Sequence, residues 1–387
     1  MNILYHKLKD CCSKIGSGAT PKGGKSVYTD EGVSLIRSQN VYNLSFAYKG
    51  LAHITDEAAK KLSGVTLQEN DILLNITGDS VARTCVVPND VLPARVNQHV
   101  AIIRPNKSLD PIFLNYYLAS PAMQGYLLNI ASTGASRNAI TKAAIEKLII
   151  PAPTIDEQHK IASLLSSYNN LIENNNKRIK ILEQMAENLY KEWFVRFRFP
   201  GHETTPIENG IPKGWEVKKI KDCVKRLPFN QTYKANELEP EGKIIVVDQS
   251  ADAYIGFHNN EPSHKANIES PILLFGDHSC KFVLMIKDFS LGENIVPFTS
   301  INADWLNPYY LFYATHKIIE TTEYKRHWGQ FVSMKILVPS STLQQKFSDF
   351  MKSIHKELDE LFIANRNLIK QRDLLLPRLM SGKLEVK

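Results

Sequence analysis

The chain repeats itself, and an internal repeat restricts the possible folds more than any other feature of this sequence. Four segments of the first half return in the same order in the second half. The paired segments are Leu8–Cys12 with Ile220–Val224, Asp71–Leu74 with Pro271–Leu274, Asp110–Tyr116 with Asn307–Tyr313, and Lys147–Pro151 with Lys335–Pro339. Their separations are 212 (220 − 8), 200 (271 − 71), 197 (307 − 110) and 188 (335 − 147) residues. We therefore expect two copies of one unit, with a second copy that has lost loop residues.

Each copy begins with a mixed region and ends in one long helix. Short apolar runs between Gly, Pro and Asn predict strands, for example at 33–36, 71–76, 100–103 and 148–150. A shorter helix is expected to begin at Asp110-Pro111 and again at Asn307-Pro308, because an N-cap side chain followed by proline favours a helix start. The long helical patterns run from Asp156 to about Phe194 and from Leu343 to about Met380.

Both long patterns carry apolar residues at heptad spacing. The rows are Ile161, Tyr168, Asn175, Leu182, Leu189 with Leu165, Ile172, Ile179, Ala186, Trp193, and Phe347, Ile354, Leu361, Leu368, Leu375 with Met351, Leu358, Asn365, Arg372, Leu379. Sustained heptads predict coiled-coil packing, and we expect each helix to pair with the other, antiparallel. Such pairing would place Asn175 beside Asn365, where a buried polar pair can fix the register; two surface amides are the alternative.

These patterns together predict an α+β fold with an internal pseudo-two-fold repeat. Two similar globular α/β domains are expected at 1–155 and 201–341. A pair of long antiparallel coiled-coil helices, at 156–200 and 342–387, would separate them as spacers.

Composition excludes several classes of protein. The 387 residues contain no run of about 18–20 apolar residues, so we expect no membrane span. The N-terminus lacks the apolar core of a secretion signal, and the five cysteines show no C-x-x-C spacing, which together favour reduced thiols and a cytoplasmic location. The net charge of +7 is compatible with a polyanionic partner but does not identify one.

Motifs that could indicate catalysis fail on closer comparison. Gly24-Lys25-Ser26 lacks the earlier glycine and the strand of a phosphate-binding loop. Asn307-Pro308-Tyr309-Tyr310 resembles the Asn-Pro-Pro-Tyr motif of DNA adenine methyltransferases, but its counterpart Asp110-Pro111 occupies the same helix start. Histidines lack metal-ligand spacing, and no Gly-x-Ser-x-Gly appears. We expect neither a catalytic site nor a bound metal or cofactor.

Polar loop residues next to predicted strands are candidate DNA contacts, because Arg and Lys can bond guanine while Asn and Gln can bond adenine. In the first copy they are Arg37, Gln39, Asn40, then Arg95, Asn97, Gln98, His99, then Thr133, Ser136, Arg137 and Asn138. In the second copy they are Gln249 and Ser250, placed 210 (249 − 39) residues after the first glutamine, and Lys325, Arg326 and Gln330. Gly329-Gln330 is the expected shortened counterpart of residues 133–138. Ordinary solvation is the alternative for any single residue, and the placement in two copies favours ligand contact.

At this point the sequence resembles the specificity subunits of type I restriction-modification enzymes, over nearly its whole length. The resemblance rests on Gly18-Ala19-Thr20-Pro21, on Lys147–Pro153 followed by Glu157-Gln158, on Leu189–Gly201, and on Leu376–Leu384. The second copy differs from the family pattern, with Gln344-Gln345 in place of Glu-Gln and no long Gly-x-Ser-Arg-Asn loop.

The resemblance implies a non-catalytic subunit with two target-recognition domains, each reading one half of a split double-stranded DNA sequence. It implies that the helices dock two methyltransferase (modification) subunits, which hold S-adenosylmethionine, and that two restriction subunits, which translocate DNA, join them. A stand-alone DNA adenine methyltransferase and a coiled-coil scaffold that binds no DNA are the alternatives.

Overall fold

The computed structural model describes residues 4–132, 139–320, 323 and 325–386. The chain divides into two compact units, the first formed by residues 1–175 with 364–387 and the second by residues 176–363. Both cuts fall inside the long helices, so each unit contains one globular part and half of each helix. The sequence predicts domains that end where each long helix begins, at residues 155 and 341, and these boundaries remain a prediction.

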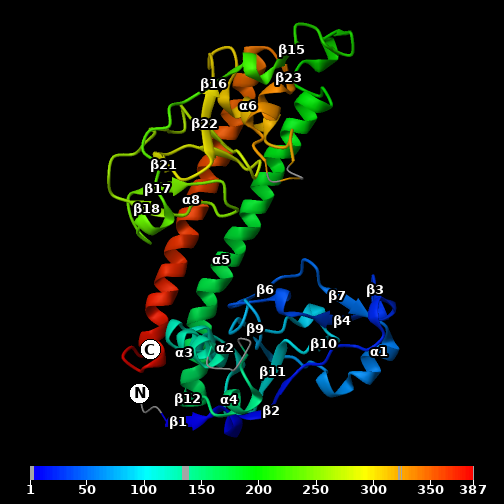
Figure 1. The fold of residues 1–387 in the computed structure, drawn as a ribbon, viewed down its shortest axis with the longest axis vertical. Helices are drawn as coiled ribbons and strands as arrows, with labels where there is room; N and C mark the ends of the chain where they lie inside the picture. The colour runs from blue at the N-terminus through cyan, green and yellow to red at the C-terminus, as the bar shows by residue number, and fades with distance from the viewer. Residues whose placement is uncertain (1–3, 133–138, 321–322, 324, 387) are drawn as a thin grey trace. The chain divides into compact units, whose positions relative to one another are not determined.

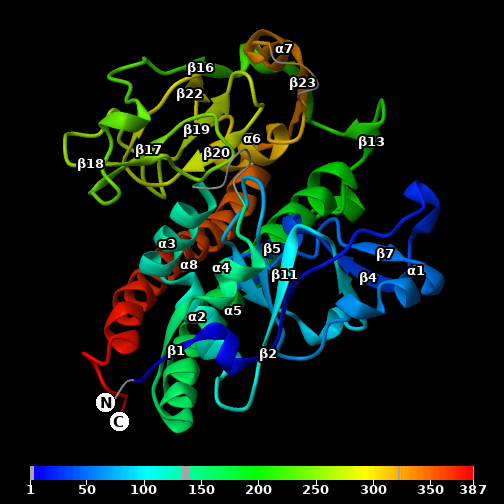
Figure 2. The same cartoon turned by 60° about the horizontal axis from the view of Figure 1, so that its bottom comes forward.

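Unit 1 contains two four-stranded sheets, ordered β2-β11-β8-β9 and β10-β4-β7-β3, and two small ribbons, β1-β12 and β5-β6. Its long strands β2 and β11 run antiparallel side by side (Figure 2). The strands are β1 (Leu4–Lys7), β2 (Cys12–Ser17), β3 (Tyr28–Thr29), β4 (Val33–Ile36), β5 (Val41–Tyr42), β6 (Ser45–Phe46), β7 (Ala52–Ile54), β8 (Ile72–Asn75), β9 (Thr84–Val86), β10 (Ala94–Val96), β11 (Val100–Pro105) and β12 (Ile149–Ala152). The helices are α1 (Asp56–Lys61), α2 (Pro111–Ala119), α3 (Pro121–Ser132) and α4 (Lys142–Glu146).

Unit 2 repeats the strand order of the first sheet, three strands of the second sheet and the ribbon formed by the first and last strands of unit 1. Its sheets are ordered β16-β22-β19-β20 and β18-β17-β21, and its ribbons are β15-β23 and β13-β14. The strands are β13 (Ile207–Glu208), β14 (Ile211–Pro212), β15 (Glu216–Lys219), β16 (Val224–Arg226), β17 (Ile244–Val247), β18 (Gly256–His258), β19 (Ile272–Gly276), β20 (Phe282–Met285), β21 (Phe289–Leu291), β22 (Ile295–Ser300) and β23 (Lys335–Val338), with helices α6 (Pro308–Thr315) and α7 (Trp328–Ser333). Strands β17 and β21 pair in parallel, as β4 and β10 do. The predicted duplication is confirmed.

The two long helices are α5 (Ile155–Tyr190), which ends in a π-helical turn at Lys191–Val195, and α8 (Ser341–Met380). Inside each unit, their segments run side by side in opposite directions (Figure 1). In unit 1, Asn175 bonds Asn365 and Arg372 bonds Asn169. In unit 2, Ile179 packs with Leu358 and Leu361. None of the heptad-row residues is exposed, and these pairs confirm the predicted antiparallel coiled-coil packing.

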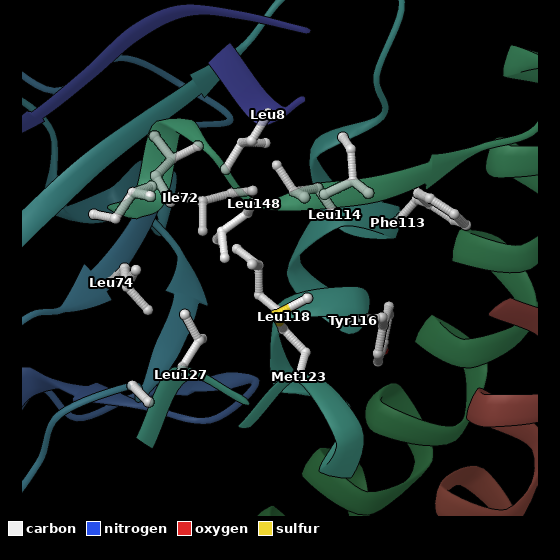
Figure 3. Packing of buried hydrophobic residues seen from close by; sticks show 14 of the residues in the cluster. Leu8, Ile72, Leu74, Phe113, Leu114, Tyr116, Leu118, Met123, Leu127 and Leu148 are labelled. Atoms are coloured by element: carbon white, nitrogen blue, oxygen red, sulfur yellow. The ribbon is translucent and has the colours of Figure 1, made fainter. Parts of the chain in front are cut away.

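Each globular part shares its core with the adjoining helix halves. In unit 1, Leu8, Ile72, Leu74 and Leu148 meet side chains of α2 and α3, including Phe113 and Leu127 (Figure 3). The same core includes Ile161, Leu165 and Leu379 from the long helices. In unit 2, residues from β19, β22, α6 and α7 pack with Trp193, Phe194 and Phe347 from the helices. The helices are therefore part of each unit's hydrophobic core.

The short helices begin where the sequence predicts. The side chain of Asp110 accepts a hydrogen bond from Phe113 N at 2.7 Å, and that of Asn307 accepts one from Tyr309 N at 2.9 Å. Each is followed by proline in the first turn. A structural N-cap thus explains both copies.

Several of the sequence pairings between the copies are wrong by a small register shift. The side chain of Gln158 donates to Pro153 O, and that of Gln344 donates to Pro339 O, so these positions correspond at a separation of 186 (339 − 153) residues. The sequence pairing of 147–151 with 335–339 is therefore two residues out. A shift of two keeps every strand side chain on the same face, which is why the alternating pattern does not detect it. It also follows that Gln344, and not Gln345, is the counterpart of Gln158.

Candidate nucleic-acid interface

The first group of candidate residues lies in the loop after β4. Arg37 Nη2 and Gln39 Nε2 both donate to Gly50 O, at 2.8 and 3.1 Å. Gly50 has φ +74°, and a Cβ there would lie 2.7 Å from Gln39 Nε2, so the loop requires glycine at this position. Gln39 is exposed and Arg37 is partly exposed, which leaves both near the surface.

Asn40 differs from these neighbours because it is fully buried. Its side chain accepts a hydrogen bond from Arg37 N at 3.0 Å and donates one to Ala47 O at 2.8 Å. Both ends of the amide are therefore used inside the loop. The structure gives Asn40 a loop-closing role, in place of the direct base contact expected from the sequence.

Two members of the second group also support the fold. Arg95 Nε donates to Ala59 O at 3.1 Å and Arg95 Nη1 to Ala94 O at 3.0 Å, and burial lowers the pKa of this guanidinium. Asn97 is buried, and its side-chain oxygen accepts from His99 N at 3.2 Å. The backbone of β10 is closely covered, since a Cβ on Gly18 would lie 2.3 Å from Asn97 O. The family-like Gly18-Ala19 pair thus packs against this turn.

Gln98 and His99 are the members of the second group that reach the surface. Gln98 is exposed, and its Nε2 lies 3.5 Å from His99 Nε2. His99 Nδ1 lies 2.6 Å from the hydroxyl of Thr77, which follows β8. The turn before β11 therefore presents an amide and an imidazole together, beside a hydroxyl from a second strand end. The third group, Thr133, Ser136, Arg137 and Asn138, lies outside the described residues.

In unit 2, the loop after β17 is held by its own side chains. Asp248 Oδ1 accepts from Ser250 N at 2.9 Å and from the Ser250 hydroxyl at 2.5 Å. Gln249 Oε1 accepts from His278 N at 3.0 Å. Both candidate residues therefore organise the loop, and both keep partial exposure.

The pairing of Gln39 with Gln249 is one residue out. Asn97 N donates to Ile36 O, and Gly292 N donates to Val247 O, which makes Ile36 and Val247 counterparts at a separation of 211 (247 − 36). Arg37 then corresponds to Asp248, and Gln249 corresponds to Ser38. The first positions of the two loops therefore carry opposite charges.

The last group lies beside α7, and its expected counterpart is also wrong. Ile140 N donates to Ile76 O in unit 1, and His327 N donates to Asp277 O in unit 2, so Ile140 and His327 correspond. The counterpart of residues 133–138 must therefore precede His327, whereas Gly329-Gln330 lies inside α7. A short helix follows the loop in both copies, α4 in unit 1 and α7 in unit 2. The sequence comparison matched residues of α7 to the loop of unit 1.

The three candidates near α7 have different surroundings. Lys325 forms an ion pair with Glu323 at 2.9 Å, and Gln330 Oε1 lies 3.3 Å from His327 Nδ1. Arg326 is 81 % exposed, with Nε 3.8 Å from Asp277 Oδ2. Arg326 also lines a hollow of about 270 Å³.

Four residues of this hollow were missed by sequence reasoning: Arg226, Phe229, Asp277 and Asn294. The Arg226 guanidinium lies over the rings of Phe229 and Trp328, 5.2 and 5.4 Å from their centroids. These residues come from three strand ends and α7, far apart in the chain. The sequence signal at Arg226 is a pair of basic residues, Lys225-Arg226, after the apolar start of β16, which is too common to single out.

The described residues offer little for catalysis. Among them, no group of three or more His, Cys, Asp or Glu side chains could hold a metal ion. Burial raises the pKa of the Cys12 and Cys85 thiols to about 12, which keeps both protonated. The Asn-Pro-Tyr-Tyr segment is closed, since Tyr309 and Tyr310 are buried and their hydroxyls donate to Ile268 O and Leu337 O. Within the described part of the chain, no helix is long and apolar enough to cross a membrane.

The chain contains two copies of one sheet-bearing unit. Each copy has polar loops at its strand ends and a share of an antiparallel helix pair, and this arrangement defines a duplicated recognition protein. The comparisons specify which one. The family model described as the type I restriction modification DNA specificity domain matches residues 5–184 and 212–371, and the chain belongs to this family. It is accordingly a specificity subunit, the non-catalytic component of such systems.

Relatives match along nearly the full length. The chain is 27 % identical to the type I restriction enzyme MjaIX specificity subunit of Methanocaldococcus jannaschii, over 98 % of this chain and 93 % of that protein. It is 23 % identical to the HindI specificity subunit of Haemophilus influenzae, over 91 % and 94 % of the two chains. The crystal structure of an S subunit from M. genitalium superposes with a TM-score of 0.61 at 16 % identity, covering 98 % of this chain and 96 % of that one, which supports the fold.

Proposed function

We propose that the chain reads a bipartite sequence in double-stranded DNA, one half-site with each unit, and lends this specificity to partner subunits. The observation that carries the proposal is that the same strand order occurs twice with different polar residues at corresponding loop positions. Arg37 corresponds to Asp248, and His99 corresponds to Asn294. A fold kept constant beneath changed loop chemistry is what reading two different half-sites requires.

We expect some residues of the strand-end loops to contact bases and other residues to contact phosphates. Gln39, Gln98 and His99 are surface groups with hydrogen-bonding capacity for bases in unit 1. The excess of seven positive charges supports attraction to the phosphate backbone, which supplies affinity without sequence preference. We expect affinity to fall steeply with salt, while the selected sequence stays the same.

The long helices are the proposed docking surface for two methyltransferase subunits, which would carry S-adenosylmethionine. Both units leave large apolar side chains exposed on the helices, in addition to the heptad rows, none of whose residues is exposed. They are Leu171, Ile369 and Leu374 in unit 1, and Ile181, Met185, Phe350, Phe362 and Ile363 in unit 2. Exposed apolar residues on two helices fit partner helices packed against them, and Leu374→Asp or Ile181→Asp should weaken assembly. Two restriction subunits would join this complex, in the cytoplasm.

The experiment is a selection from random duplexes with the chain and its cognate modification subunit together, and with each subunit alone. Two short motifs at a fixed separation, enriched only by the complex, would support the proposal. A Gln39→Ala variant should alter one motif and leave the other intact.

The selection also separates the alternatives. A single contiguous motif would contradict reading by two units. If the complex is active but no DNA sequence is enriched, the result would favour a coiled-coil scaffold that does not read DNA sequence. Methyl transfer by the purified chain with S-adenosylmethionine would favour a stand-alone adenine methyltransferase, which the buried Tyr309 and Tyr310 argue against.

A further inference from the structure

We propose that the hollow beside α7 reads a guanine-bearing base pair in one half-site, through Arg326 and Arg226. This inference rests on the proposed function and adds the residues and the base. The hollow, about 270 Å³ in volume, lies within unit 2 and is lined by Arg226, Phe229, Asp277, Asn294 and Arg326 together with the first residues of β22. Its charged residues come from the end of β16, the residue after β19 and the segment before α7.

Asp277 fixes one side of the hollow. Its backbone N donates to Asn294 O at 2.9 Å, and its backbone O accepts from His327 N at 2.8 Å. Its side-chain Oδ1 accepts from Trp328 N at 3.0 Å, which holds the carboxylate at the start of α7. The other oxygen, Oδ2, lies 3.8 Å from Arg326 Nε. The backbone of Asp277 is therefore fixed at two points and its carboxylate at one, which leaves Oδ2 beside one edge of the exposed Arg326 guanidinium.

Arg226 is oriented by a different interaction. Its guanidinium lies 5.2 Å from the ring centroid of Phe229 and 5.4 Å from that of Trp328. A cation over aromatic faces gains stabilisation while its N–H groups stay available at the edge of the plane. Arg226 and Phe229 are both exposed, so this stacked group faces solvent at the hollow.

Two pre-oriented guanidinium groups suit guanine better than any other base. An arginine donates two parallel hydrogen bonds to O6 and N7 of guanine in the major groove, and this contact discriminates by about 1–3 kcal/mol. Because Asp277 and the aromatic rings already restrict these side chains, less side-chain entropy is lost on binding. The neighbouring carboxylate could also accept from the amino group of the paired cytosine.

The corresponding place in unit 1 has different chemistry. Ile76 takes the position of Asp277, since Ile76 N donates to His99 O and Ile76 O accepts from Ile140 N. Ala139 then corresponds to Arg326, and β2 contains no arginine. His99 and Thr77 lie there instead, 2.6 Å apart. Among the described residues, the paired arginines therefore occur only at the hollow of unit 2, and we expect its guanine contact to belong to the half-site that unit 2 reads.

The test is the same random-duplex selection with four forms of the assembled complex: wild type, Arg326→Ala, Arg326→Lys and Arg226→Ala. Lys213→Ala is the matched control, because Lys213 is also an exposed cation of unit 2 in an ion pair, with Glu208 at 3.1 Å. We expect Arg326→Ala to reduce the preference for guanine at one position about 5- to 150-fold, in one motif only. Arg326→Lys should lose most of the same preference, since lysine keeps the charge but not the two-pronged geometry.

Three results would overturn the inference. The first is an unchanged guanine position in both motifs with Arg326→Ala and Arg226→Ala. The second is equal weakening of all sequences with a shallower salt dependence, and full rescue by lysine, which would identify a phosphate contact. The third is absence of any motif with the wild-type complex, which would refute the proposed function itself. Thermal unfolding of each variant verifies that the exposed substitutions leave the fold intact.

Discussion

Asn175 Nδ2 donates a hydrogen bond to Asn365 Oδ1 at 2.9 Å, joining α5 to α8 within unit 1. Asn175 lies in the first heptad row of α5 and Asn365 in the second heptad row of α8, and Asn365 is only 8 % exposed. A polar pair inside an apolar seam costs stability but penalises every register in which one amide would face a hydrocarbon side chain. We propose that this pair fixes the register of the helices.

Replacing one member of the pair should cost more than replacing both. Asn365→Leu alone leaves the Asn175 amide without this partner in a partly buried site, and we expect a loss of about 1–3 kcal/mol in the free energy of unfolding. Asn175→Leu with Asn365→Leu should recover most of that loss, because apolar packing replaces the pair. Denaturant unfolding of the four forms measures the coupling between the positions. Strictly additive effects would show that the amides act independently.

Two buried glutamines should anchor the starts of the long helices. Gln158 Oε1 accepts from Asp110 N at 2.8 Å, and Gln344 Oε1 accepts from Asn307 N at 2.8 Å. Each amide also donates to the carbonyl five residues before it. Gln344→Ala would leave several buried backbone groups unpaired, so we expect unit 2 to lose about 1–3 kcal/mol. Hydrogen exchange should show faster exchange at the starts of α6 and α8.

The neighbouring glutamine provides the control for that experiment. Gln345 is exposed and bonds only Asp349, one helical turn away, at 2.8 Å. Gln345→Ala should therefore change stability by less than about 0.5 kcal/mol. Equal effects of the two substitutions would contradict the correspondence of Gln344 with Gln158.

Helices and strands with a regular apolar pattern were predictable from the sequence, because the spacing of the apolar residues indicates which face of an element is buried. The heptads predicted the antiparallel helices, and Asp110-Pro111 and Asn307-Pro308 predicted two helix starts that the structure contains. The matches between copies were right in order but shifted by one or two residues near Gln39 and Lys147. Strand alternation has a period of two, and loops of different length separate the strands, so the sequence alone could not fix the register.

The candidate site was less predictable because burial in loops has no period. Asn40 and Gln39 are adjacent and chemically alike, yet the first is buried by hydrogen bonds with Arg37 and Ala47 and the second is exposed. The hollow beside α7 is lined by Arg226, Asp277 and Arg326, which lie far apart in the chain and are brought together only by the tertiary structure. Such a site follows from tertiary structure, and a single sequence gives no means of pairing its members.

Unit 2 should lose stability in mild acid through His355. This side chain of α8 packs among the rings of Tyr309, Phe312 and Tyr313, and its Nε2 lies 3.0 Å from the Tyr313 hydroxyl. Burial lowers the pKa of His355 from 6.5 to about 4. Between these two values the unfolded chain binds a proton that the folded chain does not, so stability falls as pH falls from 6.5 towards 4, by at most about 1.4 kcal/mol per pH unit.

Replacement of His355 isolates this contribution. His355→Gln keeps an acceptor near the Tyr313 hydroxyl but cannot titrate, so its stability should depend less on pH between 6.5 and 4 than that of the wild type. Parallel pH profiles for wild type and His355→Gln, measured by denaturant unfolding, would exclude His355 as the source.

The helix pair can be tested as a spacer by lengthening it. One heptad inserted into both helices, beside Asn175 and Asn365, adds about 10.5 Å at 1.5 Å per residue while keeping the apolar seam continuous. Since base pairs are stacked every 3.4 Å, the gap between the two selected motifs should lengthen by about three base pairs. Binding should also weaken, because three base pairs rotate the second half-site by about 100° whereas a heptad completes two helical turns. The same heptad in α5 alone disrupts the pairing and should abolish bipartite selection. A gap that stays constant in the doubly lengthened complex would show that the spacing is set elsewhere than in the helix pair.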